Sequence, residues 1–246
     1  MSKFSFLLAL MLLIIQNPMF AQELDSASIA KQNVFTSIAD AIKTPDKVFR
    51  LQLKRQNLKQ FPKEVFGFIN LSELDLSGNK IAEIPKNIDT LTHLKILNLS
   101  HNRIAEIPAG MCDLKQLSIL NVSNNKIQML PPQLGGLTDL TYLDASANKI
   151  VMLTPSIGQL SKLKSLILNR NNFKAVPTEI GDLKSLVYLD LWGTLITGLP
   201  DEIGKMKDHL KVLDLRVCVI SNTRQGIIQK LLPETDINFS KGCNCP

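Results

Sequence analysis

Aromatic residues are scarce in this sequence: they make up 5% of its 246 residues and include one tryptophan and two tyrosines. Histidine is scarcer still, because only His93, His101 and His209 occur, and none has metal-ligand spacing to a cysteine or an acid. The chain also lacks a glycine-rich phosphate loop, a metalloprotease helix motif and a nucleophile elbow. These absences argue against an enzyme, and we predict no cofactor and no metal site.

A hydrophobic run long enough to cross a membrane is also missing. The apolar run from Phe4 to Ile15 would form a helix of only ~18 Å, whereas a bilayer core is ~30 Å thick. Lys3 before the run and Ala21 after it are typical of a secretory signal. We therefore predict a signal peptide over residues 1–21, cleavage after Ala21, and a secreted or periplasmic protein with no transmembrane segment in the mature chain. No cysteine follows the run, so a lipid anchor is not indicated; an uncleaved anchor is the alternative.

The net charge alone excludes few classes of partner. The chain has a formal net charge of +6, which falls by one when Lys3 is removed with the signal. A mildly basic chain favours anionic partners weakly. It does not single out nucleic acid, which an exported protein would seldom meet, so we predict no nucleic-acid partner.

What the sequence does contain is a 23-residue repeat. In the copy LSELDLSGNKIAEIPKNIDTLTH, apolar residues, one asparagine and one proline recur at fixed places. Eight copies follow one another, and those at the two ends of the series keep the spacing with changes. The copies start at Val48, Leu71, Leu94, Leu117, Leu140, Leu163, Leu186 and Leu210.

The pattern L-x-x-L-x-L-x-x-N-x-I-x-x-I-P-x-x-I-x-x-L resembles the short form of the leucine-rich repeat family. That form occurs in many bacterial proteins and in Ras-associated scaffolds of plants and animals, and the resemblance covers roughly Val48 to Leu232. It implies an α/β repeat fold: a right-handed solenoid with a parallel β-sheet on the concave face, short turns or 3-10 segments on the convex face, and helical caps. It also implies a non-catalytic module that binds a macromolecule through the concave face. The alanine–glutamine junction is similar to that of small exported proteins of Gram-negative bacteria.

The segments outside the repeats are predicted to close the ends of the solenoid. Ile29, Phe35, Ile38 and Ile42 recur at helical spacing and predict a capping helix that ends near Lys43, within an N-terminal cap over residues 22–47. A partner-binding helix is the alternative. The repeats occupy residues 48–222, and the seventh gains one residue near 206–209. Residues 223–246 form a C-terminal cap, with a helix over 225–232, an edge strand over 236–239 and a tail.

Each L-x-L segment is predicted to be a short strand in a parallel sheet with leucines pointing inward. A buried asparagine where the chain leaves the strand is expected to satisfy backbone groups of adjacent coils. The prolines after the second apolar position should hold the outer side in short turns, and the curvature should be modest. The asparagine ladder comprises Asn79, Asn102, Asn125, Asn148 and Asn171, with Gln56, Thr194 and Cys218 as departures at its ends.

The four cysteines divide by their places in the repeats. Cys112 and Cys218 lie five coils apart, at ~24 Å, which is beyond the ~7 Å limit for a disulfide. Cys243 and Cys245 are expected either to pair with each other or to provide one partner for Cys218, and both options stay open. Cys112 is interpreted as a small buried filler, with an exposed thiol as the alternative.

Residues at the third, fifth and seventh places of each copy should line the open face of the sheet. Both tyrosines and the only tryptophan fall on this face, Tyr142 in the fifth copy and Tyr188 and Trp192 in the seventh. Aromatic side chains are enriched at binding hot spots, so we predict a recognition patch for a protein or a glycan. Aromatic residues that merely pack on each other are an equally weighted alternative. The patch consists of Tyr142, Asp144, Ile167, Asn169, Tyr188, Asp190 and Trp192.

Four basic residues occupy the same place in successive copies and should form a row along one edge. This basic row consists of Lys80, Arg103, Lys126 and Lys149. A solvated row is the ordinary interpretation, and a salt-sensitive contact with an acidic partner is the functional one. Overall, the sequence predicts a non-enzymatic module that binds a protein partner, with a glycan as a further option. The alternative is a structural or adhesive component of the cell envelope without a single specific ligand.

Overall fold

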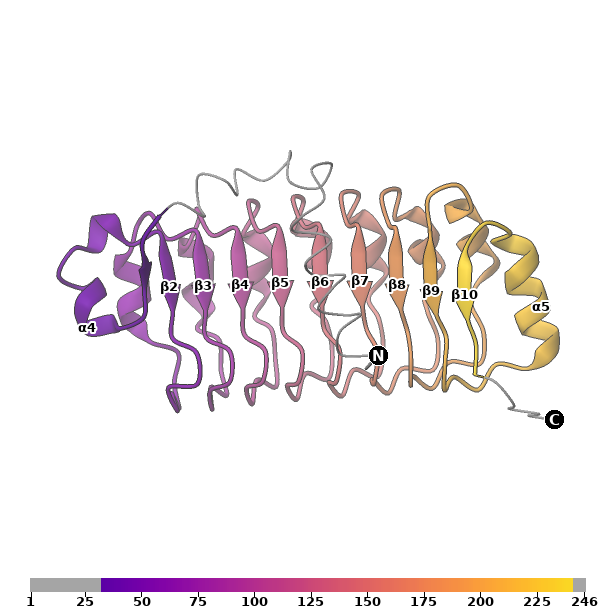
Figure 1. Ribbon diagram of the computed structural model, residues 1–246, viewed down its shortest axis with the longest axis horizontal. Helices are drawn as coiled ribbons and strands as arrows, with labels where there is room; N and C mark the ends of the chain where they lie inside the picture. The colour runs from indigo at the N-terminus through magenta and orange to yellow at the C-terminus, as the bar shows by residue number, and fades with distance from the viewer. Residues whose placement is uncertain (1–31, 241–246) are drawn as a thin grey trace.

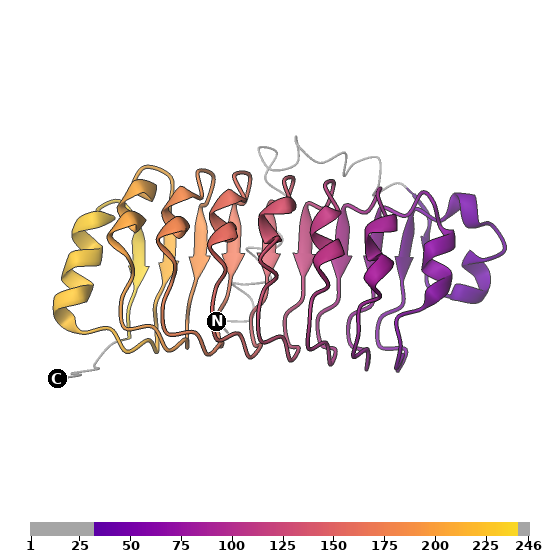
Figure 2. The same ribbon diagram turned by 180° about the vertical axis from the view of Figure 1, so that it is seen from behind.

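Each 23-residue copy forms a strand of three residues followed by a loop and a 3-10 segment. The computed structural model describes residues 32–240, in which ten parallel strands make one sheet in sequence order (Figures 1 and 2). The strands are β1 (Val34–Phe35), β2 (Arg50–Gln52), β3 (Glu73–Asp75), β4 (Ile96–Asn98), β5 (Ile119–Asn121), β6 (Tyr142–Asp144), β7 (Ser165–Ile167), β8 (Tyr188–Asp190), β9 (Val212–Asp214) and β10 (Asp236–Asn238).

The register of the sheet repeats the period of the sequence. Leu74 pairs with Leu97, Leu97 with Leu120 and Leu120 with Leu143, a step of 23 residues each time. Between β8 and β9 the step is 24, because Tyr188 pairs with Val212. The extra residue predicted near 206–209 is therefore confirmed, and the 3-10 segment before β9 takes it up.

The leucines and isoleucines of the repeat stack into one continuous apolar column between the sheet and the 3-10 segments. Nearly all of them are fully buried, from Val48 in the first copy to Ile228 beyond the last. Because each coil buries its apolar side chains against its two neighbours, the coils stabilise one another in series. The solenoid predicted from the leucine spacing is confirmed.

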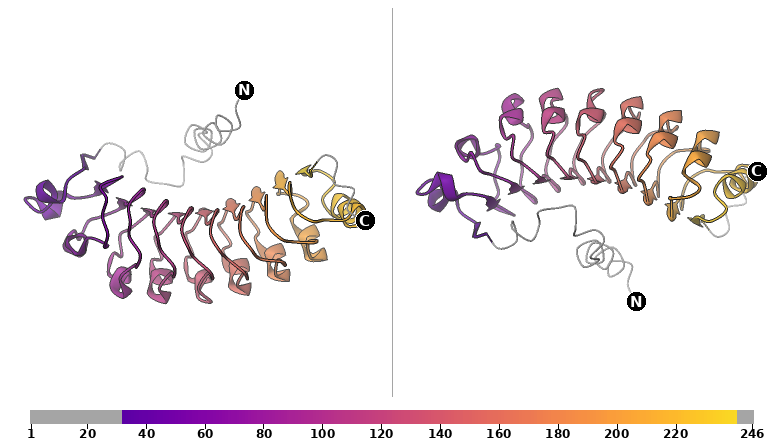
Figure 3. Two further views of the ribbon diagram at one scale, coloured as in Figure 1. Left: turned by 90° about the horizontal axis from the view of Figure 1, so that it is seen from below. Right: turned by 90° about the horizontal axis from the view of Figure 1, so that it is seen from above.

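The outer side is built from 3-10 segments that proline introduces. Pro62, Pro85, Pro108, Pro177 and Pro200 each stand directly before such a segment, whereas the fifth copy has Thr154 there and Pro155 inside it. Figure 3 shows these segments on the convex side of a shallow curve and the strands on the concave side, as predicted. The segments are η2 (Lys63–Gly67), η3 (Lys86–Thr90), η4 (Ala109–Asp113), η5 (Leu134–Gly136), η6 (Pro155–Gln159), η7 (Thr178–Asp182) and η8 (Asp201–Met206).

Glycines let the outer segments of neighbouring coils approach closely. A Cβ atom on Gly136, Gly158 or Gly181 would lie 2.5, 2.4 or 2.2 Å from a backbone carbonyl oxygen of an adjacent coil. Any side chain there would force the coils apart. The repeat pattern read from the sequence contains apolar residues, asparagine and proline but no glycine, so it does not predict this requirement.

The N-terminal cap differs from the prediction. The predicted helix that ends near Lys43 is wrong at Val34–Phe35. These two residues form strand β1 and pair in parallel with β2. The helical part is the short α4 (Ile38–Ala41), followed by the 3-10 turn η1 (Pro45–Lys47). The cap thus extends the sheet by one strand. The start of the predicted helix and the predicted signal peptide lie outside the described residues.

The C-terminal end contains the predicted helix and edge strand. Helix α5 (Asn222–Leu231) begins three residues earlier than expected, because the Ser221 Oγ accepts a hydrogen bond from the Arg224 N–H and caps the helix. Ile228 and Leu232 of this region are buried against the last coils. Strand β10 then pairs with β9. Across residues 32–240, no helix combines the length and apolar character needed to span a bilayer.

Candidate functional site

The register of the sheet places the aromatic residues of the concave face two strands apart, Tyr142 in β6 and Tyr188 and Trp192 in or just after β8. Tyr142 pairs with Ser165, and Ser165 pairs with Tyr188, so the two tyrosines flank one small residue. One step further along the strands, Asp144, Ile167 and Asp190 form the next column. All seven residues of the predicted patch therefore belong to β6, β7, β8 or the residues directly after these strands.

Ser165 occupies the space between the two tyrosines. It is 4% exposed, and its Oγ has no hydrogen-bond partner. A buried hydroxyl without a partner is unfavourable, because it loses its hydrogen bonds to water without replacement. The hydroxyl is therefore enclosed between Tyr142 and Tyr188 and does not reach the open surface of the sheet.

The acids of the patch are held in place by hydrogen bonds. The Asp190 carboxylate accepts from the backbone N–H of Trp192 at 2.9 Å and from Asn169 Nδ2 at 2.7 Å. Burial raises the pKa of Asp190 to about 6, because these donors only partly offset the loss of solvent. Burial also raises the pKa of Asp144, whose Oδ1 accepts from Ser146 Oγ at 2.6 Å.

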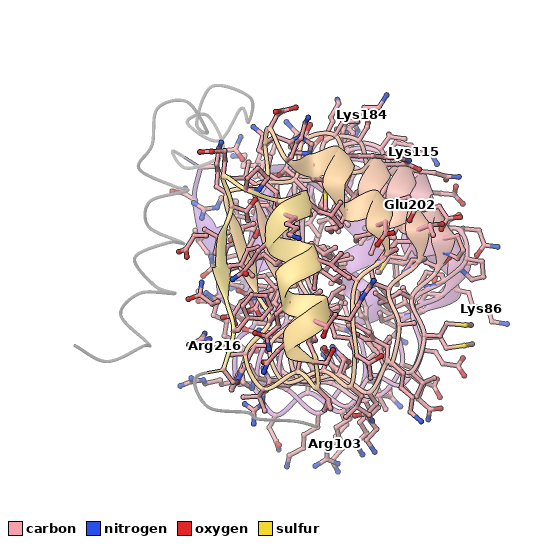
Figure 4. The ribbon with its side chains drawn as sticks, turned by 90° about the vertical axis from the view of Figure 1, so that its right-hand side faces the viewer. Lys86, Arg103, Lys115, Lys184, Glu202 and Arg216 are labelled. Carbon is pink, nitrogen blue, oxygen red and sulfur yellow. The ribbon has the colours of Figure 1, made fainter. Side chains whose placement is uncertain are left out.

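Trp192 lies between two arginines. The guanidinium carbon of Arg170 is 5.6 Å from the centre of the Trp192 ring, within the range of a cation–π contact. On the other side, the Gly193 N–H donates to the Arg216 carbonyl at 2.9 Å, so Arg216 follows Trp192 in the next coil. The Arg216 side chain is bound to Asp214, at 2.9 Å from Nε to Oδ1. Figure 4 places Arg216 on the sheet side of the molecule.

Comparison with known proteins identifies the repeat. Models of the leucine-rich repeat region and of the leucine rich repeat match residues 86–166 and 46–104. The chain belongs to the leucine-rich repeat family. Such domains generally mediate protein binding, and the leucine-rich repeat fold is typically a non-catalytic scaffold. No curated protein matches the sequence significantly.

Solved leucine-rich repeat structures resemble this chain over most of its length. A leucine-rich repeat protein of Leptospira interrogans is 33% identical, with a TM-score of 0.68, over 84% of this chain and 58% of that one. The ectodomain of the Arabidopsis thaliana receptor kinase GASSHO1/SCHENGEN3, in complex with CASPARIAN STRIP INTEGRITY FACTOR 2, is 27% identical with a TM-score of 0.69; the match covers 87% of this chain and 27% of that one.

The Arabidopsis receptor kinase HAESA ectodomain, in complex with an IDA peptide hormone, is 25% identical with a TM-score of 0.64, over 74% of this chain and 31% of that one. This leucine-rich repeat chain thus spans less than two thirds of each of these three proteins.

The patch is more enclosed than the sequence analysis expected. Tyr142 is 9% exposed and Asp190 3%, whereas Tyr188, Asn169 and Trp192 remain half-buried. Places counted along one copy put these residues on the open side of the leucine-rich repeat sheet but do not include contacts between copies. The predicted patch also leaves out Ser165, Arg170 and Arg216, which are neighbours of the aromatic residues.

The asparagines of the leucine-rich repeats make hydrogen bonds across the coils. Asn79 Oδ1 accepts from the N–H groups of Gln56 and Leu58, both at 3.0 Å, and its Nδ2 donates to the carbonyls of Leu53 and Leu76, both at 2.8 Å. Four further asparagines donate in the same way, and the Oδ1 of each accepts from one backbone N–H of the preceding coil: Asn102, Asn125, Asn148 and Asn171.

Cys218 takes over the ladder position in the last leucine-rich repeat coil. Its Sγ donates to the Leu191 carbonyl at 3.2 Å, and Thr194 Oγ1 donates to the same carbonyl at 2.8 Å. Cys218 and Cys112 are free and buried, and burial raises the pKa of the Cys112 thiol to about 11. Cys243 and Cys245 lie outside the described residues. Within residues 32–240, no group of three or more His, Cys, Asp or Glu side chains is arranged to hold a metal ion.

Proposed function

We propose that the concave face over β6–β8 recognises a protein segment, with Tyr142, Tyr188 and Trp192 as its apolar anchors. One observation carries this proposal: the sheet register gathers both tyrosines and the only tryptophan of the chain into three neighbouring coils. Aromatic and arginine side chains dominate binding energy at protein interfaces. Arg170 and Arg216, on either side of Trp192, add to this character.

The polar groups of the patch suit a peptide backbone better than an apolar ligand. The half-buried Asn169 amide, whose Nδ2 donates to Asp190, lies in the coil next to Trp192. An extended segment offers both N–H and C=O groups to such side chains. The similar HAESA ectodomain was solved in complex with a peptide hormone, which supports the same kind of occupant.

In this proposal the protein is a non-enzymatic binding module that acts outside the cytoplasm. Export rests on the sequence of residues 1–21, which combines Lys3, an apolar run and Ala21. N-terminal sequencing of protein recovered from the periplasm or the medium tests it. A mature chain that begins at Gln22 is the expected result, and a chain that keeps residues 1–21 contradicts it.

The experiment for recognition is capture of partners from envelope and medium extracts with the full chain, followed by titration of one purified partner. Tyr188→Ala and Trp192→Ala should each weaken its binding by roughly 30-fold, because hot-spot truncations cost ~2 kcal/mol or more. Phe66→Ala, a half-buried aromatic residue of the convex segment η2, is the matched control and should leave affinity unchanged.

Unchanged affinity in the Tyr188→Ala, Trp192→Ala double variant would contradict the proposal. A structural or adhesive role is the second candidate, and binding that does not saturate with any single isolated partner would favour it. A glycan ligand would be indicated if purified polysaccharide, and no protein, competes for the patch.

A further inference from the structure

The loops that follow β2 to β9 form one long edge of the solenoid with an unusual charge. We name it the post-strand edge: residues 54–61, 77–84, 100–107, 123–130, 146–153, 169–176, 192–199 and 216–220. It contains ten lysines and arginines but only two acids, Glu83 and Glu106, an excess of eight positive charges. The whole chain has a net charge of +6, so the rest of it is slightly acidic. The basic character of the protein is therefore concentrated on this edge.

Hydrogen bonds between coils arrange the basic row in single file along this edge. The backbone N–H of Arg103 donates to the Ile81 carbonyl at 2.8 Å, and the backbone N–H of Lys126 donates to the Ile104 carbonyl at 2.8 Å. Lys80 and Lys149 make the same bond to their preceding coils. The four cations thus stand one coil apart, ~4.8 Å from backbone to backbone. In Figure 4, Arg103 projects from the lower edge with other nitrogen-tipped side chains around it.

These cations are not neutralised within the described part of the protein. All four are exposed, and no carboxylate of residues 32–240 forms an ion pair with them. By contrast, Lys162 and Lys205 on the outer side pair with Asp139 and Asp182, both at 2.8 Å. Neighbouring like charges repel each other, so an anionic surface that lies against the unpaired row would lower this repulsion.

The same row becomes apolar toward the C-terminal end. Asn172 and Leu195 occupy the place of Lys149 in the next two copies, and Val219 occupies it in the copy after those. Leu195 is 46% exposed and Val219 is 54% exposed. Six of the nine large hydrophobic residues that are exposed within residues 32–240 lie on the post-strand edge. They are Met129, Val151, Met152, Leu195, Val217 and Val219.

We infer that the post-strand edge docks on an anionic lipid surface. Lysine and arginine attract anionic headgroups, and exposed aliphatic side chains enter the boundary between headgroups and acyl chains. An acidic polysaccharide would use the row but not the exposed Leu195 and Val219. The loops end at a similar level along the lower margin of Figure 1, so many of them can reach one plane. Docked in this way, the protein stands on its edge and keeps the concave patch open to a partner.

The test is sedimentation of the full chain with vesicles of equal parts phosphatidylglycerol and phosphatidylcholine, compared with phosphatidylcholine alone. Every variant keeps residues 1–31, so differences between variants report the edge. In the row variant, the four cations of the basic row are replaced together by glutamine. The control variant loses the same charge from other exposed places, by Lys86→Gln, Lys184→Gln, Lys207→Gln and Lys230→Gln.

The row variant should lose about fivefold in affinity for the anionic vesicles per removed cation, and the control much less, because the effect of a charge falls off within a Debye length. The affinity of the parent should fall with added salt. Leu195→Asn with Val219→Asn should weaken binding by a factor that salt does not change. Ile69→Asn, at a 66% exposed residue off this edge, should leave binding unchanged.

Two results would overturn the inference. One is an equal loss in the row and control variants, because net charge alone would then explain binding. The other is a parent protein that binds dextran sulfate through the row but shows no preference for the anionic vesicles, which would assign the edge to a soluble polyanion. Circular dichroism of each variant verifies that the solenoid is folded.

Discussion

Replacing Asn125 by leucine tests the hydrogen bonds that connect the coils. Asn125 is 9% exposed. Its Nδ2 donates to the carbonyls of Leu99 at 2.9 Å and Val122 at 3.0 Å, and its Oδ1 accepts from the Ile104 N–H at 3.0 Å. Leucine fills a similar volume but offers none of these groups. The substitution therefore removes hydrogen bonds and leaves the apolar column intact.

The magnitude follows from the groups that lose a partner. The carbonyls of Leu99 and Val122 still accept from Asn102 at 3.0 Å and Asn148 at 3.0 Å. The Ile104 N–H is left as the one buried donor of this set without its acceptor. Such a group costs ~1–3 kcal/mol of unfolding free energy. With an m-value of ~2 kcal/mol/M in urea, the midpoint should fall by ~0.5–1.5 M.

The assay is equilibrium unfolding in urea with two probes. Fluorescence of the single Trp192 reports the seventh coil, and circular dichroism reports the whole solenoid. The two transitions must coincide for one free energy to apply, because cooperativity can break down along repeat arrays. Asn172→Leu, at an exposed asparagine, is the control and should change stability by less than ~0.5 kcal/mol. Equal midpoints for the two variants would refute the reasoning.

Three further predictions concern backbone strain, close packing and pH. Val217→Gly should raise stability by ~1 kcal/mol in thermal unfolding, because Val217 has a φ of 62° that a β-branched residue adopts at a cost; an unchanged midpoint would contradict this. Gly181→Ala should lower stability by more than ~1 kcal/mol, because its Cβ would lie 2.2 Å from the Glu202 carbonyl oxygen, whereas Gly226→Ala in α5 meets nothing within 4 Å and should be neutral or stabilising. The raised pKa of Asp190, about 6, means that the folded state holds this proton more tightly than the unfolded state, so its contribution to stability should decline as pH rises from ~4 through 6. Asp190→Asn should flatten that slope in urea titrations between these pH values, and an unchanged slope would assign it to other groups.

The repeat unit could be predicted from the sequence because its information is local and copied many times. Leucine spacing defines the strands, and proline stands directly before five of the seven outer segments η2 to η8, so the places of Leu74 and Pro85 have similar environments in most copies. The N-terminal cap has no such copies. Val34 and Phe35 are too few to show an alternating pattern, and they form a strand only because β2 offers them an open edge. Pairing with another segment overrides the helical spacing of Phe35 and Ile38.

The sequence predicts which face of the sheet carries the candidate site, but not how deeply the neighbouring side chains bury its residues. Counting places along one copy puts Tyr142 and Trp192 on the open side of the sheet. Enclosure depends on which side chains stand in the coils before and after, and one copy contains no information about them. Ser165 shows the difference: alone it is an ordinary small residue, but between two tyrosines it becomes a buried hydroxyl without a partner.

Apart from Asn169 and Trp192, which fall within both sets, the concave patch and the post-strand edge use different residues of the same coils, so the cations of the edge can be replaced without changing the patch. Arg170 is the exception, because it belongs to the loop after β7 and also stacks on Trp192 at 5.6 Å. Replacing it by glutamine removes one cation from the edge and the cation–π contact from the patch. If both proposals hold, Arg170→Gln should weaken vesicle binding and partner binding together, whereas Lys126→Gln should affect vesicles alone. An Arg170→Gln variant that changes only one of the two measurements would mean that the other surface does not extend to this coil.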